Sequence, residues 1–174
     1  MIKQLSLAAL LAGCVSVAAL AQPAAAPTDP QIAHIAYTAD VIDITAAKQA
    51  LAKSHNAAVR AFATEMVRDH QAVNVQALAL LKRLNVTPQD NPTSQALTKQ
   101  ADAERATLAH LSGRAFDRAY VDNEVAYHHT VNGALAGTLI PDSHNADLKS
   151  LLTTGLKLFK EHEEHARHLA AQLR

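Results

Sequence analysis

The chain has 174 residues, of which 49% are hydrophobic, enough for one ordinary domain with a buried core. Sixteen basic residues balance sixteen acidic ones, which argues against a sequence-blind nucleic-acid binder, because such a protein needs a basic surface. Five glycines leave little material for a phosphate-binding loop. With three Tyr, three Phe and no Trp, the composition suits closely packed helices better than sheets.

Residues 1–21 are typical of a signal peptide, with Lys3 before the apolar run LSLAALLAGCVSVAAL and small residues before Gln22. The run is shorter than the roughly 20 residues that span a membrane. Lipidation is the alternative, since Leu11–Cys14 resembles a lipobox and would anchor the chain through Cys14. The apolar residues after Cys14 favour cleavage after Ala21. We therefore expect a periplasmic protein without a transmembrane span or an internal disulfide.

After a Pro/Ala-rich linker at 22–29, the prolines and polar breaks predict five helices in chain order. The first covers about 30–53, with Asp29 as its N-cap before Pro30. The others cover about 57–84, 94–111, 114–140 and 145–173, and Pro141 stops the fourth. Residues 30–174 are thus predicted to form an all-α, ferritin-like up-down four-helix bundle with a short extra helix in the crossover.

Each long helix carries polar residues on its apolar face, close to its midpoint. Glu65 and Asp69 are expected to point away from that face. Because midpoints of helices of similar length meet at one level in a bundle, the sequence predicts a buried polar layer. Its members are Asp43, His70, Glu124, His128 and His162.

Burying these groups is costly unless they pair or bind something. The favoured interpretation is a hydrogen-bonded network in which Asp43 and Glu124 accept from the three imidazoles. The alternative is that the five residues bind a divalent transition metal such as iron, zinc or manganese. Redox catalysis is least favoured, because the Glu-x-x-His pair of di-iron bundles is missing and Val67 and Val125 stand three before His70 and His128. No catalytic residue is predicted.

Two further features have modest interpretations. The run Lys160–His168 is read as a mostly solvated helix face with charge pairs one turn apart. Gly133 and Gly137 form a small-residue strip on which the crossover segment, or else a second subunit, could dock. Docking of the crossover is favoured.

Four strings resemble an exported bacterial family catalogued as domain of unknown function 4142, whose members often carry an outer-membrane label. They are Val59–His70, Ala115–Val121, Glu124–His128 and His162–Ala166. The resemblance covers about 30–173 and implies a ferritin-like helical bundle, an envelope location and no established activity. Many members have glutamate where this chain has Asp43, so the acidic group is shorter here.

Together, these features predict an exported periplasmic or envelope protein with a stress-associated role, and a non-catalytic function is favoured over an enzymatic one. Metal binding or sequestration through the central layer is the alternative function. A partner in the cell envelope is possible but is not identified by the sequence, and nucleic acid is not expected as a partner. The chain is expected to be a monomer or a homodimer.

Overall fold

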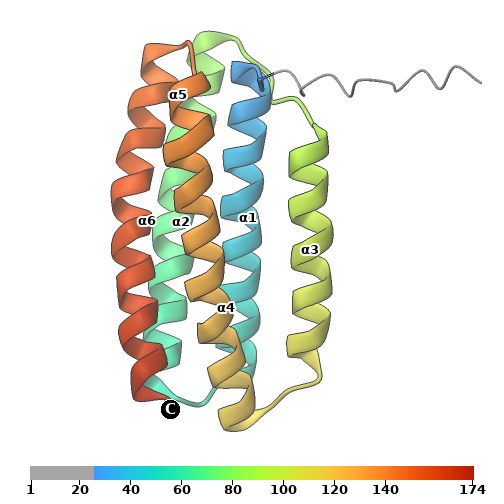
Figure 1. Ribbon diagram of the computed structural model, residues 1–174, viewed down its shortest axis with the longest axis vertical. Helices are drawn as coiled ribbons and strands as arrows, with labels where there is room; N and C mark the ends of the chain where they lie inside the picture. The colour runs from blue at the N-terminus through green and yellow to red at the C-terminus, as the bar shows by residue number, and fades with distance from the viewer. Residues whose placement is uncertain (1–25) are drawn as a thin grey trace, which may run out of the picture.

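A computed structural model describes residues 26–174, and every regular element over this range is helical (Figure 1). The elements are α1 (Asp29–Lys53), α2 (Ala57–Leu84), α3 (Pro92–Ala109), α4 (Gly113–Ala134), the π-helix η1 (Leu135–Leu139), α5 (Ile140–Asp142) and α6 (Ala146–Gln172). The all-α prediction is confirmed. The predicted signal peptide, Cys14 and residues 22–25 of the linker lie outside the described residues.

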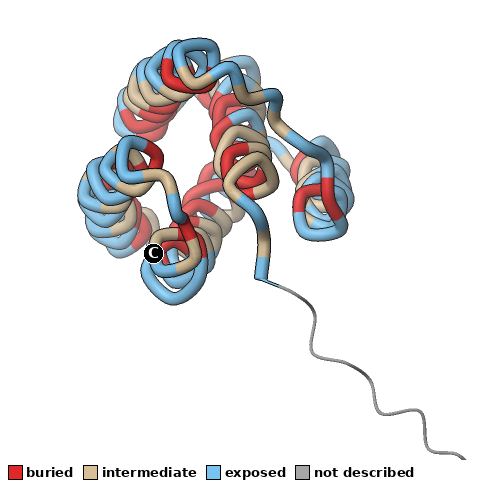
Figure 2. The backbone as a smooth tube through the Cα atoms, turned by 90° about the horizontal axis from the view of Figure 1, so that it is seen from above, coloured by how far each residue is buried: buried red, intermediate tan, exposed pale blue. Residues whose placement is uncertain are grey.

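Helices α1, α2, α4 and α6 run side by side, and α3 lies outside them against α1 (Figures 1 and 2). Helix α1 packs most extensively on α2, and α4 on α6. Because α3 carries the chain back along the length of the bundle, α4 runs parallel to α2 (Figure 1). Buried residues line the faces that the long helices turn toward one another (Figure 2).

The caps of the first two long helices differ in how well the sequence predicted them. Asn56 caps α2, and its side-chain oxygen accepts from the backbone N–H groups of Ala58 and Val59 at 2.9 and 3.2 Å. Helix α1, however, is capped by Thr28, so the prediction of Asp29 as the cap is wrong. The Asp29 carboxylate instead accepts from the backbone N–H groups of His144 and Asn145, both at 2.9 Å, and so ties α1 to the start of α6.

The fourth predicted helix is less regular than its sequence suggests. Five residues before α5 form the π-helix η1, and the chain stays helical past Pro141 to Asp142. Proline lacks the N–H that an α-helix needs, and its ring crowds the carbonyl four residues earlier. The wider π turn, in which the Ile140 N–H bonds to the Leu135 carbonyl, accommodates this proline.

The crossover helix α3 docks on α1. Gln49 of α1 donates to the Arg105 carbonyl at 3.0 Å, and in the preceding loop the Gln89 N–H bonds to the Pro30 carbonyl at 3.0 Å. These bonds hold the crossover beside α1 along its length. The prediction that the crossover docks on Gly133 and Gly137 is therefore wrong, and a Cβ added at either glycine would meet nothing within 4 Å.

The interior consists of two apolar regions separated by a polar layer. We call the region toward the C-terminus of α1 the lower core; it contains Phe62, Met66, Phe116 and Tyr120, all 0% exposed. The upper core lies toward the N-terminus of α1 and contains Ile32, Leu135, Leu152 and other aliphatic residues, with Phe159 at its base.

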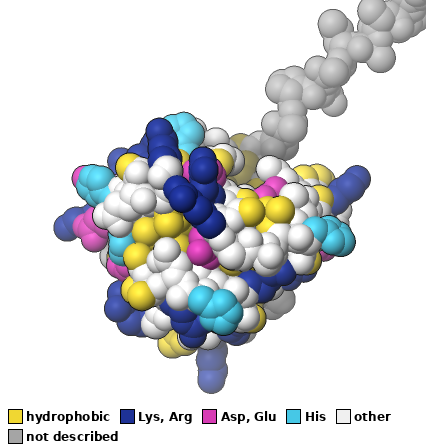
Figure 3. Space-filling model, turned by 90° about the horizontal axis from the view of Figure 1, so that it is seen from below, with side chains coloured by type: hydrophobic (Ala, Val, Ile, Leu, Met, Phe, Trp, Pro, Cys, Tyr) yellow, Lys and Arg dark blue, Asp and Glu magenta, His cyan; other side chains and the backbone are white. Residues whose placement is uncertain are grey.

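The surface is mixed. Seen from the lower end, basic, acidic and histidine side chains are interspersed, with small apolar patches between them (Figure 3). Within residues 26–174, no helix combines the length and the apolar character that crossing a bilayer requires.

Candidate metal centre

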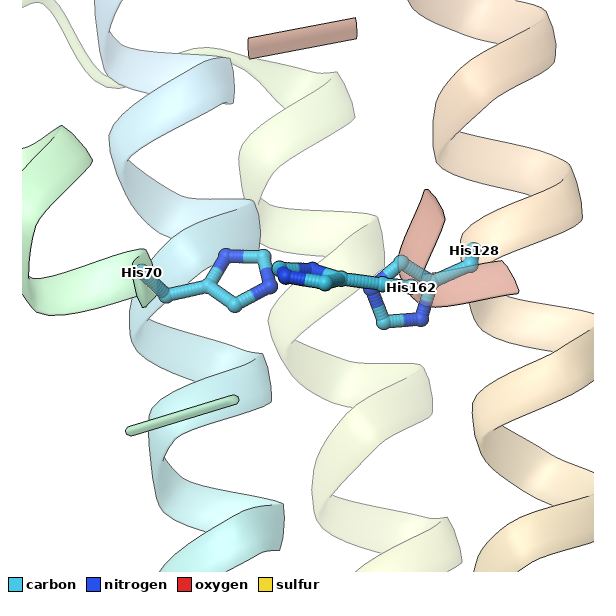
Figure 4. A group of neighbouring side chains, drawn as sticks. All are labelled: His70, His128 and His162. Carbon is cyan, nitrogen blue, oxygen red and sulfur yellow. The ribbon is translucent and has the colours of Figure 1, made fainter. Parts of the chain in front are cut away.

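Three imidazoles meet between the helices at the level of the polar layer. His70 comes from α2, His128 from α4 and His162 from α6, and their rings point toward one another (Figure 4). They are only 3%, 1% and 1% exposed. One ring nitrogen from each lies within 4.8 Å of those of the other two. Three imidazoles so placed are a common ligand set for a transition metal.

The outer nitrogen of each ring is held by an oxygen atom. His70 Nδ1 pairs with Asp40 Oδ1 at 2.7 Å, His162 Nε2 with Asp69 Oδ2 at 3.1 Å, and His128 Nδ1 with the Glu124 backbone carbonyl at 3.0 Å. A carbonyl and an ionised carboxylate only accept, so each imidazole donates the proton of its outer nitrogen. This is the arrangement by which proteins orient metal-binding histidines.

The inner nitrogens are left without partners. His70 Nε2, His128 Nε2 and His162 Nδ1 are buried, and none has a hydrogen-bond partner among residues 26–174. Since each ring donates from its outer nitrogen, a ring offers a lone pair at its inner nitrogen when it is neutral. Buried polar atoms normally find a partner, and these three nitrogens border one space without one among the described residues.

Asp43 of α1 adds a carboxylate to this space. Its Oδ2 lies 3.3 Å from His70 Nε2 and 3.4 Å from His128 Nε2, and the residue is 1% exposed. Neither carboxylate oxygen has a hydrogen-bond partner in the described part of the chain. Asp43 therefore adds two acceptor oxygens to the space that the imidazoles border.

Glu124 lies one helical turn before His128 and is 1% exposed. Its Oε2 is 3.5 Å from His128 Nδ1, and it forms a second potential ligand group with Asp43 and His128. The sequence-based interpretation had Asp43 and Glu124 side chains accepting the imidazole protons. In the structure, the imidazoles instead donate hydrogen bonds to the Asp40 side chain, the Asp69 side chain and the Glu124 backbone carbonyl.

The electrostatics of the layer follow from burial. Burial raises the pKa of the Asp43 carboxyl to about 6, and burial together with the Asp43 charge raises the pKa of Glu124 well above its usual range. Burial and the neighbouring His70 lower the pKa of His128 to about 3, and the same two causes lower the pKa of His162. The two imidazoles are thus neutral near pH 7, as metal ligands must be.

His70 behaves differently. Burial alone would lower its pKa, but the charges of Asp43 and Asp40 and the hydrogen bond that His70 donates to Asp40 outweigh burial, so the pKa of His70 is raised. Its ring stacks on Phe159, with centroids 4.6 Å apart and planes 13° apart. Phe159 and Asp40 together fix this imidazole in place.

A polar strip connects the layer to solvent between α2 and α6; we call it the α2–α6 seam and define it by Glu65, Asp69, His162 and His165. Glu65, Asp69 and His162 form a third potential ligand group. Glu65 Oε2 pairs with His165 Nδ1 at 2.8 Å, and these side chains are 31% and 47% exposed. The expectation that Glu65 and Asp69 point away from the site is wrong, because α6 packs over that edge of α2.

All five residues predicted for the layer are buried, and the structure brings them into two overlapping groups that share His128. Sequence reasoning missed Asp40 and the inward role of Asp69. Asp40 stands three residues before Asp43, so helical periodicity places it on the same side of α1. Asp69 precedes His70 directly, and only the position of α6 decides that it reaches His162.

Comparison with curated proteins and with solved structures finds no match for this chain. Comparison with protein families finds one over residues 15–169, which include all five layer residues and both carboxylates that hold an imidazole. The matched range spans most of the chain. The protein therefore belongs to the family described as Domain of unknown function (DUF4142).

Proposed function

We propose that this protein binds a divalent transition-metal ion in its buried polar layer, through His70, His128, His162 and Asp43. One observation carries the proposal: three buried ring nitrogens without partners face one space, while the opposite nitrogen of each ring is held by an oxygen. A cation in that space would be the acceptor that these lone pairs lack.

The separation of the ligand atoms supports this. A tetrahedral metal with bonds of about 2.0–2.1 Å to nitrogen and oxygen keeps its ligand atoms about 3.3–3.4 Å apart. Asp43 Oδ2 lies at 3.3 and 3.4 Å from the inner nitrogens of His70 and His128. At such a distance two acceptors repel each other unless a proton or a cation lies between them.

The chemical nature of the four proposed ligands narrows the choice of metal. Three imidazoles and a carboxylate suit zinc, iron or manganese better than calcium or magnesium, which prefer oxygen ligands. The mature domain has no thiolate, so the set does not favour copper(I). Without Glu-x-x-His pairs, the proposal is sequestration or structural binding of the ion, with Glu124 beside it, rather than di-iron oxidation.

The α2–α6 seam supplies a route for the ion. A hydrated cation that leaves water needs oxygen or nitrogen atoms along its path. Glu65 and Asp69 provide carboxylates at partly exposed positions, and His162 is common to the seam and to the layer. We infer that ions reach the layer between α2 and α6.

The proposal includes a fold and a location. Four long helices side by side with a crossover between the second and third support a ferritin-like four-helix bundle, a fold that builds metal sites from facing helices. The signal-peptide pattern at 1–21 supports export to the periplasm, with anchoring through Cys14 as the alternative. A metal-storing or stress-protective role in the envelope would fit both.

The deciding experiment is elemental analysis of untagged protein purified from the periplasm without chelators. We expect about one zinc, iron or manganese ion per chain, lost in His128→Ala and His162→Ala and kept in the control His168→Ala, an exposed histidine on the same helix as His162. Circular dichroism establishes that each variant is helical. Protein that remains empty after exposure to zinc, iron, manganese and copper, or folded variants that keep the metal, would refute the proposal.

A further inference from the structure

The upper core encloses a large apolar cavity. It has a volume of about 790 Å³ and lies among α1, α2, α6, the first turns of α3 and the segment from α4 through η1. Its walls are formed by apolar side chains that include Ile35, Val73, Leu81, Leu135, Leu148 and Leu152. Its volume is within the range of about 300–1,000 Å³ that is typical of small-molecule sites.

Small residues and the π-helix create this space. Ala36 and Ala77 line it where a larger side chain would fill it, and Gly155 adds no side chain at all. The π-helix η1 contributes Leu135 and Leu139 to the wall, and π turns often occur at functional sites. Below the polar layer, the lower core is filled by aromatic, Met and smaller apolar side chains.

The cavity is elongated along the bundle axis. On α6 its lining extends from Leu148 to Phe159, which at a rise of about 1.5 Å per residue is about 16 Å. On α1 it extends from Gln31 to Asp40, a similar length. These proportions fit a molecule with a medium-length alkyl chain better than a compact one.

The charges of the lining restrict the ligand further. Among residues 26–174, no Lys, Arg or His lines the cavity, and the two charged lining residues, Asp40 and Asp142, are both acidic. Asp40 is already paired with His70. An anionic head group would therefore find no cation among these lining residues. A neutral head group could bond to the Thr138 hydroxyl and could donate to the Thr130 oxygen, whose own proton goes to the Ala126 carbonyl.

We propose that the upper core binds an uncharged lipophilic molecule with an alkyl chain, such as a long-chain alcohol. The chain lies along the bundle axis between α1 and α6, and a neutral polar end remains near the hydroxyl-lined wall. This site is separate from the metal ligands, and its test does not depend on the presence of a metal.

The test uses the protein as it accumulates in an expressing bacterium, with its N-terminus read by mass spectrometry. The probe is N-phenyl-1-naphthylamine, an uncharged dye that fluoresces in apolar surroundings. We expect saturation near one dye per chain, and displacement by 1-dodecanol but not by dodecanoate. Absence of dye binding, or equal displacement by dodecanoate, would overturn the proposal.

Two variants place the dye within the molecule. Ala36→Phe and Ala77→Phe fill the cavity from α1 and α2, and each should weaken dye binding by about tenfold or more. The matched control is Ala72→Phe, at an exposed position on α2 outside the lining, which should bind as the unaltered chain does. Equal dye affinity in all three variants would contradict the assignment.

Two measurements cover the remaining outcomes. If the filled variants do not fold, a rise in the thermal midpoint of the unaltered chain with 1-dodecanol, absent with dodecanoate, tests the same claim. Ala26 and Pro27 line the cavity mouth, so the chain that precedes them is a competing occupant. Dye binding that appears only after proteolysis removes that segment would assign the cavity to the protein's own N-terminus and overturn the proposal.

Discussion

The two apolar regions of the bundle are built from the same four long helices, yet they are packed differently. Below the polar layer, Phe62, Met66, Phe116 and Tyr120 are all 0% exposed and fill the interior. Above it, aliphatic and small residues surround a cavity of about 790 Å³. Dense packing stabilises a fold, whereas a cavity lowers its stability. The lower core is therefore the more densely packed half of the bundle, and the two proposed ligands would occupy the layer and the region above it.

The largest difference should appear when large side chains are truncated in the two cores. Phe116→Ala leaves a new cavity in a filled interior and should lower the free energy of unfolding by about 3–5 kcal/mol. Leu152→Ala enlarges a space that already exists and should cost less than about 2 kcal/mol. Urea denaturation measures both values. Equal losses would mean that the two halves are packed alike.

The polar layer between the cores can be tested through its own metal-dependent stability. Zinc at a hundredfold excess over its dissociation constant should stabilise the unaltered chain by about 2.7 kcal/mol. Burial raises the pKa of Asp43 to about 6, which means that burying the charged carboxylate costs stability in the metal-free protein. Asp43→Asn should therefore remove most of the zinc-dependent gain without destabilising the metal-free protein. The control is Asp122→Asn, at an exposed position on α4. A full zinc response in Asp43→Asn would exclude this carboxylate as a ligand.

The α2–α6 seam should affect how fast the metal binds more than how tightly. Glu65→Gln should slow binding of cobalt, followed by visible absorption, by about three- to tenfold and leave the final metal content unchanged. Glu161→Gln, an exposed carboxylate on α6, serves as the control. If Glu65→Gln binds cobalt at the normal rate, ions reach the layer by another path.

The smallest expected effect concerns acidification of the metal-free protein. Burial lowers the folded-state pKa of His162 below its usual value of 6.5. The folded protein therefore favours the neutral imidazole. The stability that this form contributes is present above about pH 6.5 and is lost as the pH falls below that value. Thermal unfolding with a chelator between pH 8 and 5 should show a steeper decline in the unaltered chain than in His162→Gln. Parallel curves would contradict this assignment.

Much of the architecture could be predicted because local signals agree with tertiary packing. The sequence predicts α2 at 57–84, and the structure has it from Ala57 to Leu84, since Asn56 provides a cap and the apolar stripe continues to the end. The polar layer was predictable for a similar reason, because a helix fixes both the face and the height of each residue. The π-helix η1 was not, because it depends on how the turn around Pro141 packs.

The hydrogen-bond partners of the histidines needed the tertiary structure. Asp40 and Asp69 are ordinary helical carboxylates in the sequence. Their roles arise only because α1 packs beside α2, which brings Asp40 to His70, and α6 packs beside α2, which brings His162 to Asp69. The same is true of the inner nitrogens, whose lack of a partner is a property of the assembled bundle.

The order of residues alone therefore decides the helices, their buried faces and the level at which Asp43, His70, Glu124, His128 and His162 meet, since helical geometry is local and regular. The packed bundle decides which nitrogen of each imidazole is held and which is free, where α3 docks, and that the upper core is hollow. These depend on distances between helices, which side chains far apart in the chain set together.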